Sequence, residues 1–157
     1  MRKWLLVVAL LSFACGAPLN SDSDDPAEPV QLTEQTAAQC ENGANGFIDI
    51  SDSLVGTRVK PILDLGSGVS VTLESGTVAG AQRGWARIHG STIAGDQVWM
   101  DWTTNNGSSW LQCGPFTVGF SGMSKTSAAK KTSSSTSYRF RACGRLVGSS
   151  SKCIIWW

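Results

Sequence analysis

The strongest constraint on the fold is a series of short segments in which apolar and polar residues alternate. In GVSVTLES, for example, Val69, Val71 and Leu73 share one face, and polar side chains occupy the other. A period of two indicates a β-strand that is buried on one face. GWARIHG and DQVWMDW follow the same pattern, and LQCGPFTVGF, SYRFRACGRL and KCIIWW are further strand candidates.

Clusters of Gly, Ser, Asn and Asp separate these segments, and the chain has 17 glycines among 157 residues. No helical repeat extends over ten or more residues. We therefore predict an all-β domain, a small antiparallel β-sandwich or barrel, over residues 40–157. Residues 121–137 break the pattern: they are rich in Ser, Thr and Lys. We expect them to form a mobile surface loop with room for a short edge strand.

The chain begins with MRKWLLVVALLSFAC, a basic start followed by a short apolar run. This is the pattern of a secretory signal peptide, which we expect over residues 1–14. The run is too short to stay in a bilayer as a helix, which takes about 20 residues. Ala14, Cys15 and Gly16 resemble the end of a bacterial lipobox, which makes Cys15 a candidate for lipidation. Ordinary cleavage and a freely secreted product remain the alternative.

Residues 15–39 are rich in Ser, Asp, Pro and Glu. Such a composition buries too little apolar surface to offset the entropy of ordering, so we expect a disordered acidic tether. The chain from residue 46 onward has 11 basic and 6 acidic residues, a net charge of +5. A surplus of this size is ordinary for a solvated surface, and no nucleic-acid partner is expected.

The five cysteines are an odd number, and removing Cys15 leaves an even set for disulfides. Cys143 and Cys153 lie symmetrically about a turn in RLVGSSSK, so we predict a Cys143–Cys153 bridge across a hairpin. The remaining pair is Cys40–Cys113, although four cysteines allow other pairings. The chain has one histidine and no Cys-x-x-Cys spacing, so neither a metal nor another cofactor is expected. The hairpin register places Phe140 opposite Trp156, and Arg139 over Trp157 as a cation–π pair.

The stretch DWTTNNGSSW covers residues 101–110. From Thr103 to Trp110 it resembles the Asp-box, with Asn105 where Asp is usual. The resemblance covers eight residues and identifies no family, and it implies a hairpin turn that generally lies away from an active site. An antiparallel register that puts all apolar residues on one face pairs Trp102 with Leu111, Met100 with Cys113 and Val98 with Pro115. We interpret the stretch as a structural hairpin, with a ligand-binding loop as the alternative.

Catalytic constellations are weak in this sequence. A secreted ribonuclease needs a carboxylate base, a histidine acid and arginines near the phosphate. Glu74, His89, Arg83 and Arg87 are of the right types, but nothing in the sequence places them together. Gly-x-Ser-x-Gly is absent, as is a convincing pair of facing carboxylates for glycoside hydrolysis. We assign no catalytic residue and do not expect an enzyme.

Tryptophan is the residue in excess, with six in the body of the chain. Strand parity places Trp102, Trp110 and Trp156 inward and leaves the other three for the opposite faces. Exposed aromatic rings on a sheet form platforms for sugars or protein partners. The alternative is that the sandwich buries them all. The ligand-binding candidates are Trp85, Trp99, Trp157, Arg87, Arg139 and Arg141.

These features favour an exported, non-enzymatic binding domain at a bacterial surface, with a glycan or an extracellular protein as the ligand. A proteinaceous inhibitor of a secreted hydrolase is the first alternative, with residues 121–137 as the inhibitory element. A small secreted ribonuclease is the second. The expected location is the cell envelope, with membrane contact only through a lipid on Cys15, or the extracellular space.

Overall fold

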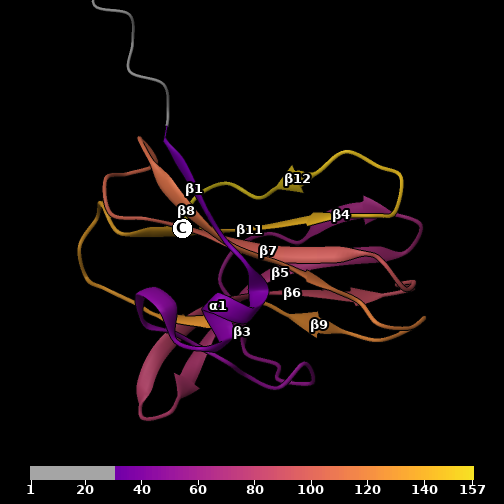
Figure 1. Cartoon of the computed structure of the whole chain (residues 1–157), viewed down its shortest axis with the longest axis horizontal. Helices are drawn as coiled ribbons and strands as arrows, with labels where there is room; N and C mark the ends of the chain where they lie inside the picture. Colours follow the sequence, from indigo (N-terminus) through magenta and orange to yellow (C-terminus); the bar gives the residue numbers. More distant parts are fainter. Residues whose placement is uncertain (1–30) are drawn as a thin grey trace, which may run out of the picture.

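A computed structural model describes residues 31–157 as two β-sheets packed face to face, with one short α-helix (Figure 1). The predicted all-β fold with two disulfides is confirmed. The expected signal peptide, the lipidation candidate Cys15 and residues 15–30 of the expected tether lie outside the described residues. Within the described part of the chain, no helix has the length and apolar character needed to cross a membrane.

The first sheet has the strand order β1-β8-β7-β11-β12. Its pairs are antiparallel except for β1 and β8, which run parallel. Figure 1 shows β1 lying alongside β8 at one edge of this sheet. The five strands are β1 (Leu32–Gln35), β7 (Gln97–Thr103), β8 (Trp110–Thr117), β11 (Arg139–Arg145) and β12 (Lys152–Cys153).

The second sheet has the order β2-β10-β6-β5-β3, with β4 also paired to β5 and β9 to β6. The long β5–β6 hairpin forms its centre, and the alternating residues of GVSVTLES lie in β5. The strands are β2 (Phe47–Ile48), β3 (Thr57–Arg58), β4 (Leu63–Gly66), β5 (Val69–Val78), β6 (Ala81–Gly90), β9 (Lys125–Thr126) and β10 (Ala129–Lys131).

The core lies between the two sheets and contains the residues that the alternation predicted. Val69, Val71 and Leu73 of β5 are at most 1% exposed. They belong to the same core cluster as Val98 and Met100 of β7, which are fully buried. Burying a side chain of this size contributes about 1.5–3 kcal/mol relative to leaving it in water.

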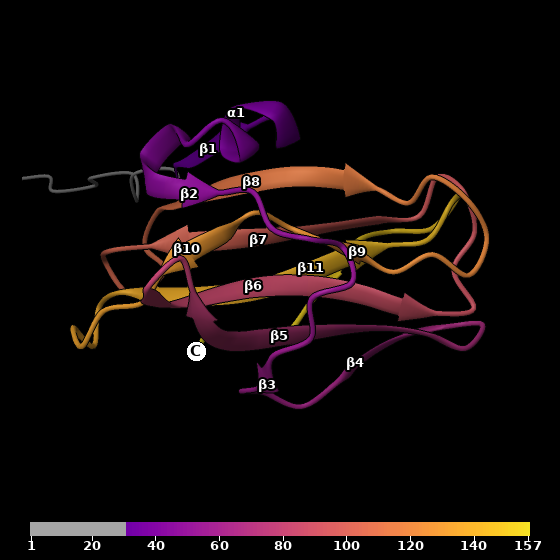
Figure 2. The same ribbon diagram turned by 90° about the horizontal axis from the view of Figure 1, so that it is seen from below.

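The domain begins earlier than residue 40, because residues 32–41 are ordered against the first sheet. Helix α1 (Ala37–Glu41) starts at a capping box in which Thr36 and Gln39 bond each other's backbone N–H groups. It lies beside β2 and β8 (Figure 2) and carries Cys40. The Cys40–Cys113 disulfide closes a loop of 73 residues. On the chain-entropy model, this cross-link stabilises the fold by roughly 4 kcal/mol.

The hairpin predicted around residues 101–110 joins β7 to β8. Trp102 pairs with Leu111 and Met100 with Cys113 as predicted, but Val98 pairs with Phe116 rather than with Pro115. The register shifts at a bulge between these pairs. Because proline has no backbone N–H to donate to a ladder, Pro115 is a natural place for that irregularity.

The turn of this hairpin satisfies its own polar groups. The side-chain oxygen of Asn105 accepts from the Ser109 backbone N–H at 3.0 Å, and its amide nitrogen donates to the Ser109 hydroxyl at 2.8 Å. The Thr103 hydroxyl accepts from the backbone N–H of Gly107 at 3.1 Å. These bonds favour the interpretation as a structural turn.

The C-terminal segment pairs with β11 in the predicted register as far as Ile154, and beyond it the register is shifted by one residue. Cys143 faces Cys153 as predicted. Beyond Ile155, however, Trp157 exchanges two backbone hydrogen bonds with Phe140, at 2.8 and 3.0 Å, in the place predicted for Trp156. Ile155 is 70% exposed, as expected for the extra residue of a bulge. The bulge sends Trp157 toward the core and Trp156 to the outer face.

The expected mobile loop over residues 121–137 is wrong for its middle part. β9 and β10 add to the second sheet there, and Ser127, Ala128 and Ala129 are buried. The Ser127 hydroxyl accepts from the Ala86 backbone N–H at 2.9 Å. Small side chains let the segment lie close to β6, and this packing overrides the loop-like composition.

Residues 51–56 lie over part of the outer face of the second sheet, and the middle of β5 and of β6 is buried on both faces. Trp85 is 1% exposed there. It lies so close to Gly56 that a Cβ atom on Gly56 would be 2.6 Å from its ring. The backbone N–H of Gly56 donates to the buried Glu74 at 2.9 Å. The prediction that Trp85 faces solvent is therefore wrong.

We predict that Gly56→Ala lowers the free energy of unfolding by about 1–3 kcal/mol, because the added methyl overpacks Trp85. Guanidinium denaturation followed by tryptophan fluorescence measures the effect. Gly119→Ala is the control, because its Cβ would meet only Met123, at an ordinary 3.7 Å. Equal stability of the Gly56→Ala variant and the parent protein would contradict the close cover over Trp85.

Candidate functional site

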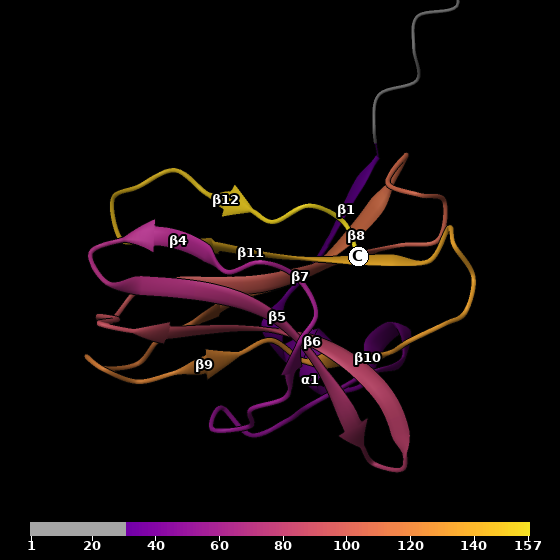
Figure 3. The same cartoon turned by 180° about the vertical axis from the view of Figure 1, so that it is seen from behind.

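One end of the sandwich carries an open cavity of about 340 Å³ between the two sheets, which we call the end cleft. It lies where the chain crosses from β10 in the second sheet to β11 in the first. Figure 3 shows this crossing segment beside the marked C-terminal residue. The cleft is lined by Thr132, Ser133, Ser135, Thr136, Tyr138, Arg139, Phe140 and Trp157.

The crossing segment, residues 132–138, is shaped by its own hydroxyl and backbone groups. The Thr132 backbone N–H and hydroxyl both donate to the Gln82 carbonyl, at 3.0 and 3.2 Å. The Ser133 hydroxyl accepts from the Ser135 backbone N–H at 3.2 Å. Ser137 accepts from the Asn106 backbone N–H at 2.9 Å through its carbonyl, which ties the segment to the β7–β8 turn. The segment is thus anchored at both ends.

Aromatic rings form the apolar wall of the cleft. Trp157 stacks on Phe140 with ring centroids 5.9 Å apart and an interplanar angle of 28°. Tyr138 meets Phe140 edge-on at 5.4 Å. The Tyr138 hydroxyl donates to the Lys131 carbonyl at 2.8 Å. Three aromatic residues and four Ser or Thr residues therefore line one space.

Of the six predicted ligand-binding residues, the structure brings Arg139 and Trp157 together in the end cleft. The predicted cation–π pair of Arg139 with Trp157 is not formed. Arg141 instead makes cation–π contacts, with Trp110 and Trp156. Trp99 is only 8% exposed, because it lies opposite the cross-linked Cys143 in the ladder. Its predicted exposure is wrong, like that of Trp85.

Arg141 is held on the outer face of the first sheet by three groups, which we call the Arg141 clamp. Its guanidinium carbon lies 4.7 Å from the ring centroid of Trp110 and 4.5 Å from that of Trp156. Its Nε donates to Asp101 Oδ2 at 2.7 Å. Trp110 and Trp156 were predicted to face inward, but both lie outward: Trp110 is next to Leu111, which pairs with Trp102, and Trp156 follows the bulge at Ile155. The guanidinium of Arg141 is thus engaged in contacts within the fold.

Asp101 is a buried carboxylate whose pKa departs clearly from its ordinary value. Its side chain is 2% exposed. Burial raises its pKa to about 6, although the hydrogen bond and the positive charge of Arg141 act in the opposite direction. Asp101 Oδ1 is buried without a hydrogen-bond partner among the described residues. The sulfur atoms of Cys143 and Cys153 also lie within 4.8 Å of this carboxylate, but they are joined in a disulfide and do not offer thiolates to a metal.

The residues considered for ribonuclease chemistry come partly together on the outer face of the second sheet. Arg87 Nη1 lies 3.8 Å from Glu74 Oε1. His89 is the next residue on the same face of β6, and its pKa is lowered by burial and by Arg87. Glu74, however, is 4% exposed and accepts from the Gly56 N–H and the Thr72 hydroxyl. A general base must reach its substrate, and this carboxylate is enclosed by the fold.

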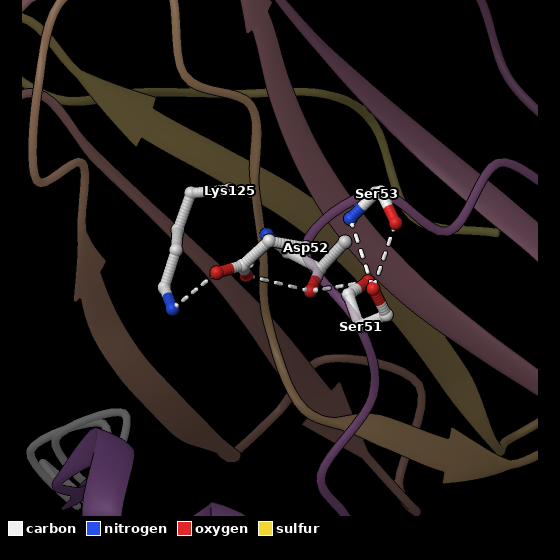
Figure 4. Close-up of polar contacts among 5 residues, drawn as sticks. Ser51, Asp52, Ser53 and Lys125 are labelled. Atoms are coloured by element: carbon white, nitrogen blue, oxygen red, sulfur yellow. Dashed lines mark hydrogen bonds and ion pairs between the residues drawn. The ribbon is translucent and has the colours of Figure 1, made fainter.

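Next to Arg87, the covering segment is fastened by Asp52 (Figure 4). Asp52 Oδ2 accepts from Lys125 Nζ at 2.9 Å, and Oδ1 accepts from the Thr126 backbone N–H at 3.1 Å. The Ser51 and Ser53 hydroxyls bond each other at 2.8 Å. A cavity of about 360 Å³ opens beside this cluster. Both carboxylate oxygens are engaged in holding the segment, which indicates a structural role for Asp52.

Lys130 is a buried cation that the sequence placed in a loop. It is 9% exposed, and its Nζ lies 4.2 Å from the ring centroid of Trp102 and 5.5 Å from that of Phe47. The amine also donates to the Asn45 carbonyl. Burial lowers its pKa, with a second contribution from Arg83. Nothing in the local sequence distinguishes Lys130 from its exposed neighbour Lys131.

The hydroxyl-bearing lining and the Tyr138 and Phe140 rings were missed as site residues. The available signal was the abrupt change from a Ser/Thr-rich run to the aromatic strand SYRF. Comparisons of the chain with protein-family models, with curated proteins and with solved structures gave no match.

The raised pKa of Asp101 predicts a specific pH dependence of stability. Its ordinary value is 3.8, so the folded state binds more protons than the unfolded state between about pH 4 and 6. The contribution of Asp101 to stability is therefore greatest below pH 4 and falls as the pH rises through 6. We predict that the parent protein gains about 1–3 kcal/mol over Asp101→Asn as the pH falls from 7 to 4.

Urea denaturation of both proteins at several pH values measures this difference. Asp49→Asn, at an exposed position, controls for the general effect of removing a carboxylate. A difference between parent and Asp101→Asn that stays constant, or that grows as the pH rises, would show that burial does not dominate at this site.

Proposed function

We propose that the protein is an exported, non-enzymatic carbohydrate-binding domain and that the end cleft receives the sugar. The observation that carries this proposal is the pairing of an aromatic wall with several hydroxyl side chains in one cavity. Its volume of about 340 Å³ lies in the range of small-molecule sites. The ligand class follows from the chemistry of these two surfaces.

The aromatic wall suits the apolar faces of sugar rings. Pyranose rings present C–H groups on their faces, and flat aromatic side chains bury such surfaces with little loss of conformational freedom. Trp157 is partly buried and lines the cavity, so part of its ring is available to a ligand. Phe140 behind it is 2% exposed and supports the ring rather than contacting the ligand.

The hydroxyl side chains suit the edges of the same rings. A Ser or Thr hydroxyl both donates and accepts, as a sugar hydroxyl does, so either orientation of the ligand can be satisfied. Ser133, Ser135 and Thr136 are exposed at the cleft. The lining contains no carboxylate and no histidine, whereas glycoside hydrolysis ordinarily uses two carboxylates. Binding without chemistry is therefore the activity that this lining supports.

The proposed location outside the cytoplasm has separate support. Two disulfides in a small β domain are compatible with an oxidising compartment. The sequence of residues 1–15 supports export through a signal peptide, followed by lipidation of Cys15 or by release. The inhibitor alternative has less support, because the middle of its proposed inhibitory segment forms β9 and β10 of the second sheet and is not a free loop.

We predict that Trp157→Ala weakens binding to oligosaccharides by about tenfold or more, since it removes the ring that the sugar packs on. Isothermal titration calorimetry of the full chain against a panel of tetrasaccharides measures the affinity. Phe120→Ala is the matched control: Phe120 is an aromatic residue 65% exposed that does not line the cleft.

Trp157 also packs on the core, so its removal costs stability as well. Thr136→Val provides a second test, because it removes one exposed hydroxyl of the cleft and keeps the shape of the side chain. Its affinity is expected to fall while its melting temperature stays near that of the parent. Unchanged sugar affinity in both folded variants, or no binding by the parent to any member of the panel, would refute the proposed function.

A further inference from the structure

Arg139 lines the end cleft, and the terminal nitrogens of its guanidinium have no hydrogen-bond partner among the described residues. Its Nε donates to the Thr136 carbonyl at 3.0 Å, which fixes the direction of the side chain. Among residues 31–157, no group accepts a hydrogen bond from its two terminal nitrogens. An oriented guanidinium with both terminal nitrogens available matches the two oxygens of a carboxylate, or of a sulfate or phosphate ester.

Other basic residues lie near Arg139, which itself forms no ion pair with a carboxylate among the described residues. The ion pairs among the described residues are formed by Arg87, Lys125 and Arg141, all of them elsewhere. Arg83 and Lys131 face each other across β6 and β10, and the Lys131 carbonyl holds the Tyr138 hydroxyl at the cleft. Arg83 lies close enough to lower the pKa of Tyr138, although burial of that hydroxyl raises it more.

Three basic residues around the end cleft form no ion pair among the described residues. Arg87 and Arg141 meet buried carboxylates within 4 Å, so their charges are already balanced. Arg139, Arg83 and Lys131 have no carboxylate within 4.0 Å among the described residues. One terminal nitrogen of Arg83 is also buried without a hydrogen-bond partner there. The fold therefore leaves positive charge unbalanced around an aromatic, hydroxyl-rich cavity.

We propose that the sugar bound in the end cleft is anionic, and that Arg139 binds its carboxylate or sulfate group. This inference rests on the proposed carbohydrate-binding function and specifies its ligand class. The ring of Trp157 takes the sugar face, and the terminal nitrogens of Arg139 take the charged substituent. Lys131 and Arg83 add a favourable field without needing to touch the ligand.

The experiment compares oligosaccharides that differ only in charge. The first pair is tetragalacturonate and its fully methyl-esterified form, and the second is a sulfated galactan tetrasaccharide and its desulfated form. Calorimetry with the full chain is expected to show that the charged member of at least one pair binds about 10- to 100-fold more tightly than its neutral partner. The two pairs separate a carboxylate ligand from a sulfate ligand.

Variants then assign the preference to Arg139. Arg139→Gln is expected to lower the affinity for the charged member to that for the neutral one and to leave the neutral affinity within about twofold. Arg139→Lys retains part of the preference, because the charge stays and the fork is lost. Arg58→Gln, at an exposed position on β3, changes the net charge equally and is expected to leave the preference unchanged.

Several outcomes would overturn the inference, and they differ from those that refute the function. Equal affinity for charged and neutral members means that the cleft binds sugars but is indifferent to charge. Loss of the preference in Arg58→Gln means that only the overall charge matters. Inorganic sulfate or tetraglutamate binding as tightly as the charged sugars means that the site takes anions without recognising a sugar. No binding to any oligosaccharide refutes the function together with the inference.

Discussion

The guanidinium of Arg141, held between two indole rings and against a buried carboxylate, is the interaction on which the rest of the architecture depends. It binds the C-terminal strand, through Trp156, to the β7–β8 hairpin, through Trp110. With Trp156 fixed on the outer face and Cys153 fixed to Cys143, the bulge at Ile155 turns Trp157 inward. The aromatic wall of the end cleft is thus a consequence of a contact on the opposite face of the sheet.

Buried charge engages the arginines on the broad faces of the sandwich. On the first sheet, Asp101 and Arg141 neutralise each other beneath the disulfide and the indole rings. On the second sheet, Glu74 anchors Gly56 and Arg87 beneath the covering segment. Each carboxylate bonds the element that covers it, because a buried charge without such partners is costly. Arg87 and Arg141 on these faces are paired within the fold, whereas Arg139 at the end forms no ion pair among the described residues.

Period-two alternation and cysteine spacing were sufficient to predict the fold class, the β5–β6 and β7–β8 strands and both disulfides. Alternation reflects backbone geometry that is local in the sequence, and the Cys143–Cys153 pair follows from its symmetry about a turn. Cys40–Cys113 followed only as the remaining pair, with other pairings open. The exposure of tryptophans was not predictable in the same way. Trp85 has the alternation of a half-exposed strand, and it is buried because residues 51–56, far from it in the sequence, lie over it.

The end cleft shows the same limit. The sequence predicted Arg139 opposite Trp157, but Trp157 pairs with Phe140 and turns toward the core because of a bulge of a single residue at Ile155 that no spacing rule indicates. Likewise, the buried Lys130 lies in a Ser/Thr/Lys-rich run whose composition predicts a loop, and only the rings of Trp102 and Phe47 explain its position. Local pattern predicts strands, and long-range packing decides which side chains remain open to a ligand.

The most direct test of this account is an NMR titration that follows the indole N–H signals of the tryptophans in ¹⁵N-labelled protein as tetragalacturonate or the sulfated galactan tetrasaccharide is added. The account predicts that the signal of Trp157, assigned by its loss in Trp157→Phe, shifts with the ligand, while the signals of the buried Trp85 and Trp99 stay in place. Shifts centred on Trp110 and Trp156 with a stationary Trp157 would contradict it, because they would place the ligand on the outer face of the first sheet.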